Sequence, residues 1–589
     1  MMRVIRTVLL VVVAVTALSV WMSAAGPTPI ADAAMNRDRE TVRTLLRQGG
    51  DVNAAQGDGM TALHWAAMQN DAELAGMLLY AGANLRATTR LGAYTPLHLA
   101  TEAGAPATVA TLLAAGADAN AAAAAGTTPL MLAAAAGDPR IVQQLLDKGA
   151  DPNAKESAHG QTALMFAAAQ DRADVVTLLL ARGADANVAS SFVDLLALAG
   201  LDGEGRRVNA PTPAPGTQAP EQAPAAPQPA GEPASTPRPA AVAPRGKPRP
   251  PDVPGVTRGF RYNELIGRQG GLTPLHFAAR QGHAATARAL LAGGAKVNLV
   301  SPGDGTSPLL IAIVNGHFDL ATYLLEQGAD PTLTSNAGAT PLYAVLNVQW
   351  APKAAYPQPR AYLQQEHSYL DVMAALLERG ADPNVRVNRK IWYTSYNFDQ
   401  SSMDEIGATP FWRAAYASDV EAMKLLVAHG ADPSIPTIKP ARRPRNEDSP
   451  PELEDVSGLA PLPVGGPGIT PLQAAAGVGY GQGFAGNSHH FAPTGMMAAV
   501  RYLVDELGAD VNAVDHEGNT ALHHAAARGD NDMILYLVSK GADPKRVNRA
   551  GQTTVDMANG PVQRIEPFPE TIALLEKLGA KNNHKCVSC

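Results

Sequence analysis

One seven-residue pattern recurs along almost the whole chain and constrains its fold more than any other feature. Its clearest copy starts at Thr273, reads Thr-Pro-Leu-His-Phe-Ala-Ala, and is followed by a closing Gly294. The first position of this heptad falls at Thr28, Thr61, Thr95, Thr128, Thr162, Thr273, Ser307, Thr340, Thr409, Thr470, Thr520 and Thr553. The closing glycine falls at Gly49, Gly82, Gly116, Gly149, Gly183, Gly294, Gly328, Gly380, Gly430, Gly508, Gly541 and Gly579. A spacing of about 33 residues indicates one stacked structural unit.

The heptad predicts the start of a helix. Thr273 suits the N-cap, where its hydroxyl accepts from a free backbone N–H. Pro274 suits the first helical position, since its missing N–H costs nothing there. Leu275 begins a narrow apolar face. A second apolar run ends before Gly294, which can adopt the left-handed conformation that closes a helix. The unit is therefore helix, turn, helix and extended stretch, and it must bury its faces against neighbouring copies.

These repeats resemble the ankyrin repeat. The Thr-Pro-Leu-His signature and its variants occur at Thr95-Pro96-Leu97-His98, Thr273-Pro274-Leu275-His276 and Thr520-Ala521-Leu522-His523, and Gly-Ala-Asp-Pro-Asn at Gly149–Asn153. The resemblance implies an all-α ankyrin-repeat solenoid of stacked helix-turn-helix pairs with β-hairpin fingers. The heptad starts and the closing glycines together predict twelve units. The first and last units depart from the signature, with Ala31 and Asp556 at the histidine position. Terminal repeats are expected to differ because they face water on one side.

Insertions are predicted where the number of residues between a heptad start and a closing glycine departs from its regular value. Two lie between the helices of a unit, at about 347–367 and 477–495, and three lie in fingers, at about 188–270, 385–406 and 435–467. Residues 207–258 are rich in Pro and Ala and are expected to form a disordered linker. The linker either splits the array into 26–206 and 259–580 or loops out of one finger, and the residues from Leu265 to Leu272 favour looping out. Phe192–Leu201 is predicted to be a short helix.

Residues 1–25 predict export. Arg3 and Arg6 precede an apolar stretch, and small residues follow at Ser23-Ala24-Ala25. This is typical of a cleaved secretory signal, with an uncleaved N-terminal anchor as the alternative. The expected location is the bacterial periplasm or cell surface, with inner-membrane anchoring if the segment is retained. A net charge of −7 gives no general electrostatic case for nucleic-acid binding.

The repeated polar residues are predicted to be scaffold. A metal array is the alternative for the signature histidines, but side chains a repeat apart do not surround one ion. We expect each ring to bond locally, as the resemblance implies. The aspartates that follow a closing Gly-Ala are expected to form turns. Because no nucleophile elbow, Walker A or zinc-protease motif is found, we expect no enzyme activity and no cofactor.

The terminal residues 581–589 carry the one chemical oddity, Cys586-Val587-Ser588-Cys589. It resembles the start of a c-type haem attachment site without the histidine. With His584 it is also a weak candidate metal site. A small disulfide or a simple tail is preferred, and electron transfer or metal binding through these cysteines is the alternative function.

The insertions supply the candidate partner-binding residues. Aromatics are only 5% of the chain, yet they cluster in the finger insertion 385–406, and such clusters make binding anchors. Packing onto neighbouring fingers is an equal alternative. The candidates are Trp392, Tyr393, Tyr396 and Phe398, with His489, His490 and Phe491 in the Gly-rich insertion and Trp350 in the other interhelical one. In the last finger insertion a basic run beside an acidic run favours self-neutralisation as much as an anionic partner. We expect a monomeric, non-enzymatic scaffold that binds a protein through its concave side around 340–500; catalysis by His489 and His490 has less support.

Overall fold

The computed structural model describes residues 28–198, 258–259, 262–350, 360–391, 405–441, 455–479, 492–560 and 566–585. For 262 and 263 only the backbone is described. In these ranges no helix has the length and apolar character needed to cross a membrane. The predicted signal or anchor at 1–25, and all of the predicted linker except Arg258, lie outside them.

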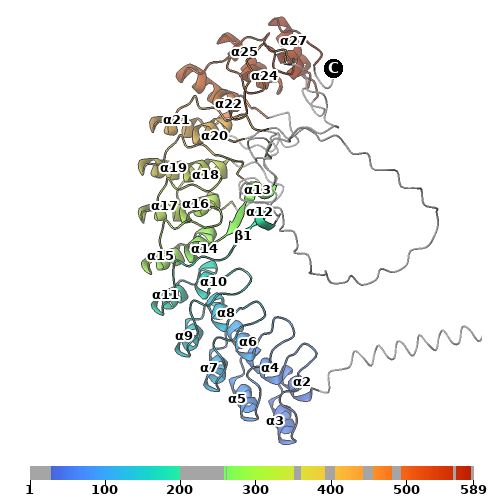
Figure 1. Cartoon of the computed structure of the whole chain (residues 1–589), viewed down its shortest axis with the longest axis vertical. Helices are drawn as coiled ribbons and strands as arrows, with labels where there is room; N and C mark the ends of the chain where they lie inside the picture. Colours follow the sequence, from blue (N-terminus) through green and yellow to red (C-terminus); the bar gives the residue numbers. More distant parts are fainter. Residues whose placement is uncertain are drawn as a thin grey trace, which may run out of the picture.

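The fold is a curved stack of antiparallel helix pairs, shaped like a C in Figure 1. The first helices of the pairs line the inner, concave side: α2 (Pro29–Met35), α4 (Ala62–Met68), α6 (Pro96–Glu102), α8 (Pro129–Ala136), α10 (Ala163–Ala169), α14 (Pro274–Gln281), α16 (Pro308–Val314), α18 (Pro341–Gln349), α20 (Pro410–Tyr416), α22 (Pro471–Ala475), α24 (Ala521–Ala526) and α26 (Thr554–Ala558). The second helices form the outer row: α3 (Arg39–Arg47), α5 (Ala72–Tyr80), α7 (Pro106–Ala114), α9 (Pro139–Asp147), α11 (Ala173–Ala181), α15 (Ala284–Ala292), α17 (Phe318–Glu326), α19 (Tyr369–Glu378), α21 (Val420–Ala428), α23 (Gly495–Arg501), α25 (Asn531–Ser539) and α27 (Pro569–Lys577). A π-helical stretch, Tyr502–Glu506, extends α23.

Each inner helix begins directly after the first position of a heptad. Thr273 is the N-cap of α14, and its hydroxyl accepts from the backbone N–H of His276. Gly294 follows α15 with a φ of 90°, where a side chain would be strained. The helix pairs stack closely because the alanines of the inner helices are buried; Ala278 and Ala279 have no exposed surface. One hydrophobic core runs from Ile30 to Ala580 as a result.

The stack is continuous across the long insertion. Helix α10 packs against α14 and α11 against α15, although about ninety residues separate the pairs in sequence. His283 Nδ1 lies 3.0 Å from the carbonyl oxygen of Ala168, and the Thr286 hydroxyl donates to Asp171 at 2.8 Å. The insertion therefore loops out of one finger, and the array does not split into two lobes.

The start of that insertion corrects one expectation. Residues predicted as a single short helix form strand β1 (Phe192–Asp194) and then helix α12 (Leu195–Leu198). Strand β1 pairs antiparallel with β2 (Arg268–Gly270), with Phe192 opposite Gly270 and Asp194 opposite Arg268. The returning chain supplies the backbone partners that favour a strand here. Helix α13 (Tyr262–Ile266) precedes β2 and packs on α12.

The fingers are joined mainly to one another. Among the residues that the structure covers, β1 pairs with β2, and Ile438 and Pro467 form an isolated bridge. The other described fingers keep the hairpin form that the resemblance implied, closed by short-range bonds such as that from the Glu156 N–H to the Gln161 carbonyl at 3.0 Å, and no ladder joins neighbouring fingers among these residues. Instead, Asn153 donates to the Gly183 carbonyl at 2.9 Å and accepts from the Asp185 N–H at 2.8 Å. One asparagine thereby satisfies two backbone groups of the next finger.

The interhelical insertions lie where the spacing predicts. One follows α18 and includes a 3-10 turn at Ala361–Gln364 before α19. The other separates α22 from α23. Both meet the turn between α20 and α21, since Trp350 donates to Asp419 at 2.8 Å and the Ala492 N–H donates to the Ala417 carbonyl at 2.8 Å.

Candidate functional site

The signature histidines are structural links between repeats. The ring Nδ1 of His276 accepts from the Thr273 N–H at 3.3 Å, so the proton resides on Nε2, which donates to the Thr306 carbonyl at 2.9 Å. His64 and His98 make the equivalent bonds to Tyr94 and Thr127, each at 3.1 Å. Burial lowers the pKa of His276 to about 4, so the ring is neutral at physiological pH. Each of these three rings thus caps its own helix and holds the finger of the following repeat.

The part of the chain that the structure describes contains no group of three or more His, Cys, Asp or Glu side chains placed to hold a metal ion. A buried His–Asp contact lies near the C-terminus, where His524 Nε2 is 3.3 Å from Asp515 Oδ2. Burial alone would raise the pKa of Asp515, but the hydrogen bond and charge of His524 hold it below its usual value. His524 is 2% exposed, so this pair is enclosed in the repeat and offers no open site.

A row of apolar side chains lines the concave face of the first repeats. These residues occupy the fifth heptad position of the second to fifth repeats and are partly exposed: Trp65, Leu99, Leu132 and Phe166. The indole N–H of Trp65 donates to Gln56 in the adjacent finger at 2.7 Å, which places the ring between inner helix and finger. Met35 and Met68, each 41% exposed, lie beside the start of this row. Sequence reasoning missed this row, although the apolar fifth position of successive heptads was its signal.

The concave face of the central repeats is filled instead. Tyr343 and Trp412 replace the signature histidine of their repeats and are fully buried. Trp412 stacks on Tyr416 with ring centroids 5.3 Å apart, and its indole donates to the Ile469 carbonyl at 2.9 Å. The finger insertions supply the cover, and the whole set forms a second core cluster: Ala337, Ala339, Tyr343, Val387, Ile391, Ala408, Trp412, Tyr416, Ile469, Ala474 and Val478. Among the described residues, this part of the surface predicted around 340–500 is therefore interior.

Trp350 is buried rather than displayed. It is 9% exposed, donates to Asp419, and meets Tyr369 edge-on at 6.0 Å. Its carbonyl accepts from Arg413 Nη2 at 2.9 Å. The expectation that Trp350 contacts a partner is therefore corrected. Its side chain is buried in contacts within the array.

The other candidate residues fall outside the described ranges: Trp392, Tyr393, Tyr396, Phe398, His489, His490, Phe491, Cys586 and Cys589. The structure does fix the chain next to them. Ile391 is buried before the aromatic finger. The Lys585 N–H donates to buried Asp556 at 3.2 Å, so the chain is anchored one residue before the terminal cysteine motif. His584 is exposed beside this contact.

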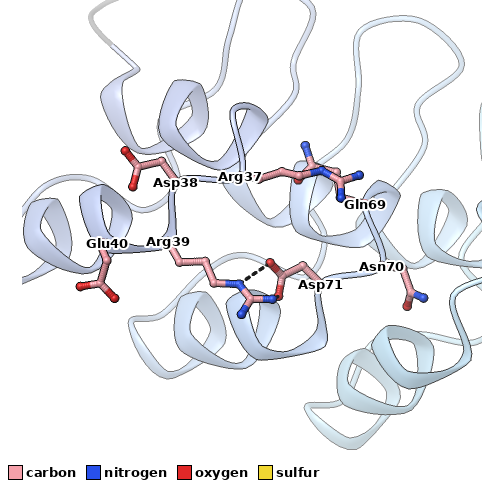
Figure 2. A pocket seen from close by; sticks show the side chains of 7 residues that line it. All are labelled: Arg37, Asp38, Arg39, Glu40, Gln69, Asn70 and Asp71. Carbon is pink, nitrogen blue, oxygen red and sulfur yellow. Dashed lines mark hydrogen bonds and ion pairs between the residues drawn. The ribbon is translucent and has the colours of Figure 1, made fainter.

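An open depression of about 590 Å³ lies at the turns of the first two repeats (Figure 2). Its lining is mixed in charge: Arg37, Asp38, Arg39, Glu40, Gln69, Asn70 and Asp71. Arg39 binds Asp71 through two bonds of 2.7 and 2.8 Å and Glu73 through a third of 2.7 Å. Its guanidinium is therefore already paired, and the cluster braces the terminal repeat against the second.

Comparison with known proteins agrees with this architecture. A model described as ankyrin repeats (3 copies) matches residues 30–123, 97–190 and 259–335, one described as ankyrin repeats (many copies) matches 488–538, and one described as ankyrin repeat matches 406–438. Together these models cover more than half of the chain.

Several curated relatives match a short part of the chain. Diacylglycerol kinase zeta of Rattus norvegicus is 36% identical over 84 residues, 14% of this chain and 8% of that protein. The Caenorhabditis elegans homolog of ankyrin repeat and LEM domain-containing protein 1 is 39% identical over 67 residues, 11% and 9%. Protein phosphatase 1 regulatory subunit 12A of Rattus norvegicus is 33% identical over 98 residues, 17% and 9%. The chain spans less than a tenth of each of these relatives. With its stacked helix pairs and its family matches, the chain belongs to the ankyrin-repeat family.

Proposed function

We propose that this chain is a non-enzymatic scaffold that binds a protein partner through the concave face of its N-terminal repeats. Ankyrin repeats support a role in protein–protein interaction. The observation that carries the finer proposal is the partly exposed apolar row of Trp65, Leu99, Leu132 and Phe166. Aromatic and large apolar side chains grouped on a rigid surface are the usual anchors of an interface.

The rigidity of the array favours this use of the row. Successive inner helices hold the row side chains one repeat apart, and hydrogen bonds between successive fingers hold the fingers in place beside the row. A partner that binds such a surface need not wait for the surface to order, which lowers the entropic cost of association. The row runs through four successive repeats, so an extended or helical partner would bury several anchors at once.

The inserted loops remain a second part of the proposal. Trp392, Tyr393, Tyr396 and Phe398, with His489, His490 and Phe491, lie outside the described residues, so their role rests on the sequence alone. The structure describes their flanks, where Ile391 is buried before the aromatic finger. A double change of Trp392 and Tyr396 to Ala tests their contribution.

The proposed location is outside the cytoplasm, in the periplasm or at the cell surface. The support is the sequence of residues 1–25, with Arg3 and Arg6 before an apolar stretch. Fractionation of cells that express the full chain, followed by mass spectrometry of its N-terminal peptide, distinguishes a cleaved signal from a retained anchor. The alternative function, electron transfer or metal binding through Cys586 and Cys589, also rests on the sequence alone; a haem spectrum or bound metal in the purified chain is its test.

The concave-face proposal is tested by crosslinking in the native cell. Trp65→Ala combined with Phe166→Ala should remove the proteins that crosslink to the wild-type chain. Tyr80→Ala is the matched control, because Tyr80 is a large aromatic at the end of the outer helix α5 and is 96% exposed. A crosslinked set that is unchanged in the double variant, or lost equally in the control, would contradict the proposal.

A further inference from the structure

The chain that returns from the long insertion lies on the fingers of later repeats. We call Arg258, Gly259 and helix α13 (Tyr262–Ile266) the return arm; it lies on the concave side of the array, beside the central inner helices (Figure 1). Leu265 and Ile266 of the arm close a cavity of only about 10 Å³, enough for about one water. The opposite wall consists of finger residues, which we call the finger face: Asp304, Ser335, Asn336, Ala337 and Arg389.

Direct contacts extend along the array in both directions. Arg389 Nη1 donates to the carbonyl of Glu264 in the arm at 3.1 Å. At Gly259 an added Cβ would lie 3.5 Å from the Ala441 carbonyl oxygen, so the arm also touches the next finger. The arm thus bridges four successive fingers, from the one holding Asp304 to the one holding Ala441.

The finger face is itself an ordered surface. The Asn336 N–H donates to the Asp304 carbonyl at 2.7 Å, and the Asn388 N–H donates to the Ala337 carbonyl at 3.0 Å. These bonds join consecutive fingers side by side, as in the fingers that the arm does not touch. The arm therefore lies on a surface that the repeats form without it.

A buried ion pair fixes the shape of the arm. Arg258 donates to both carboxylate oxygens of Glu264, each at 2.6 Å. The two residues are 4% and 3% exposed. An isolated stretch of this length cannot bury an ion pair by itself, so other parts of the chain contribute to the burial. Breaking such a pair leaves an uncompensated buried charge, which strongly disfavours the bound arrangement.

We propose that the finger face is a binding surface for short helical segments and that the return arm is its in-chain ligand. A partner segment should share three features of the arm: an arginine–glutamate pair, a helix carbonyl that accepts from Arg389, and an adjacent Leu-Ile pair that closes the small cavity. A partner segment of this chemistry must displace the arm. The inference rests on the array acting as an interaction surface, but it assigns other repeats than the N-terminal groove, so the two can fail separately.

The test uses a fluorescent peptide with the sequence of residues 256–268 and the full-length chain. In the wild-type chain the tethered arm competes at high effective concentration, so the peptide should bind weakly. In the chain carrying Glu264→Gln the arm is weakened, and the peptide should bind at least tenfold more tightly by anisotropy. The same peptide with its own glutamate changed to glutamine should lose this gain. Arg268→Gln is the matched control chain, because Arg268 makes an exposed ion pair with Asp194 off the finger face, at 2.8 Å.

Two further measurements keep the result decisive. Adding Arg389→Met to the Glu264→Gln chain should lower peptide affinity again, since the Glu264 carbonyl loses its donor. Hydrogen exchange in Glu264→Gln should rise in the arm and finger face only, and the peptide should restore protection there. Equal binding to the wild-type and Glu264→Gln chains, or no binding to either, would overturn the proposal. A rise in exchange through α16 and α18 would also overturn it, because the arm would then be part of the fold rather than a ligand.

Discussion

Trp350 donates its indole N–H to Asp419 Oδ2 at 2.8 Å, and this bond ties the start of one insertion to the turn of the following repeat. Asp419 also accepts from the Tyr369 hydroxyl at 2.8 Å and from the Ala422 N–H at 3.1 Å, as the N-cap of α21. Burial, together with the charge of Asp419, raises the pKa of Tyr369 well above its usual value, so the hydroxyl keeps its proton and donates. The carboxylate thus organises three elements from two repeats.

Trp350→Phe should therefore destabilise the central repeats. The change keeps most of the ring but removes a donor from a buried carboxylate, which costs about 1–3 kcal/mol. Hydrogen exchange of α19 and α21 measures the loss locally, as an array of repeats need not unfold in one step. Trp65→Phe is the control, because its indole bonds a neutral amide at a partly exposed site. Equal losses in the two variants would contradict the assigned role of Asp419.

The sequence predicts the helices well because their signals are local. An N-cap threonine, a proline at the first position and a closing glycine all act within one unit, so each helix such as α14 follows from its own residues. The return arm could not be predicted in this way. Helix α13 has five residues, too few for a periodic pattern, and its bond with Arg389 depends on how the fingers stack.

The filled central groove had a signal that the sequence interpretation did not use. Tyr343 and Trp412 stand where other repeats have histidine. A large aromatic ring at this position, next to a finger, must be shielded from water by other residues. The insertions at 385–406 and 435–467 are near enough in sequence to shield it. The same insertions also suggested an exposed binding surface. For the described residues, the packing of Trp412 on Tyr416 shows a buried cluster instead.

Stability should fall as the signature histidines become protonated. Burial lowers the pKa of His276 and His523 to about 4, against about 6.5 in an unfolded chain. A depressed folded-state pKa gives stability that is fully present above pH 6.5 and is lost as pH falls toward 4. Below pH 4 each ring should lower the free energy of unfolding by on the order of 3 kcal/mol. Denaturant unfolding followed from pH 7.5 to 4.5 should show this decline.

His276→Gln isolates the contribution of one ring. The chain already contains the replacement: Gln473 occupies the same heptad position, accepts from the Thr470 N–H at 2.7 Å and donates to the Asn519 carbonyl at 2.8 Å. The variant should keep most of the stability at pH 7 and lose less than the wild type between pH 6.5 and 4.5. His584→Gln, at an exposed tail position, is the control. A pH profile as steep as that of the wild type would show that other groups cause the decline.

Asn153→Leu should loosen the contact between two fingers. The change removes the donor to the Gly183 carbonyl and the acceptor of the Asp185 N–H, while the helices keep their packing. Because both backbone groups are exposed to water, the cost should be about 1 kcal/mol, the net value of ordinary hydrogen bonds. Amide exchange at Asp185 reports the change directly, and unchanged exchange there would contradict the bridging role.

The last repeat is closed by a carboxylate at the position where four of the other repeats have histidine. Asp556 accepts from the Thr553 N–H at 2.8 Å, the Asn583 N–H at 3.1 Å and the Lys585 N–H at 3.2 Å. Asp556→Asn retains one acceptor oxygen and introduces two donors that find N–H groups opposite them. The helix cap should survive in part, whereas the tail should detach, at a cost of about 1–3 kcal/mol.

Proteolysis at the tail lysines measures that detachment. Trypsin should cut after Lys581 and Lys585 much faster in Asp556→Asn than in the wild type, while cleavage after Lys540, at the end of α25, stays unchanged. Thr553 also holds the tail, since its hydroxyl donates to the Lys581 carbonyl at 2.6 Å, so Thr553→Val should release the same segment. If neither change speeds cleavage after Lys585, Asp556 acts only as a helix cap, and the residues leading to Cys586 are held by other contacts.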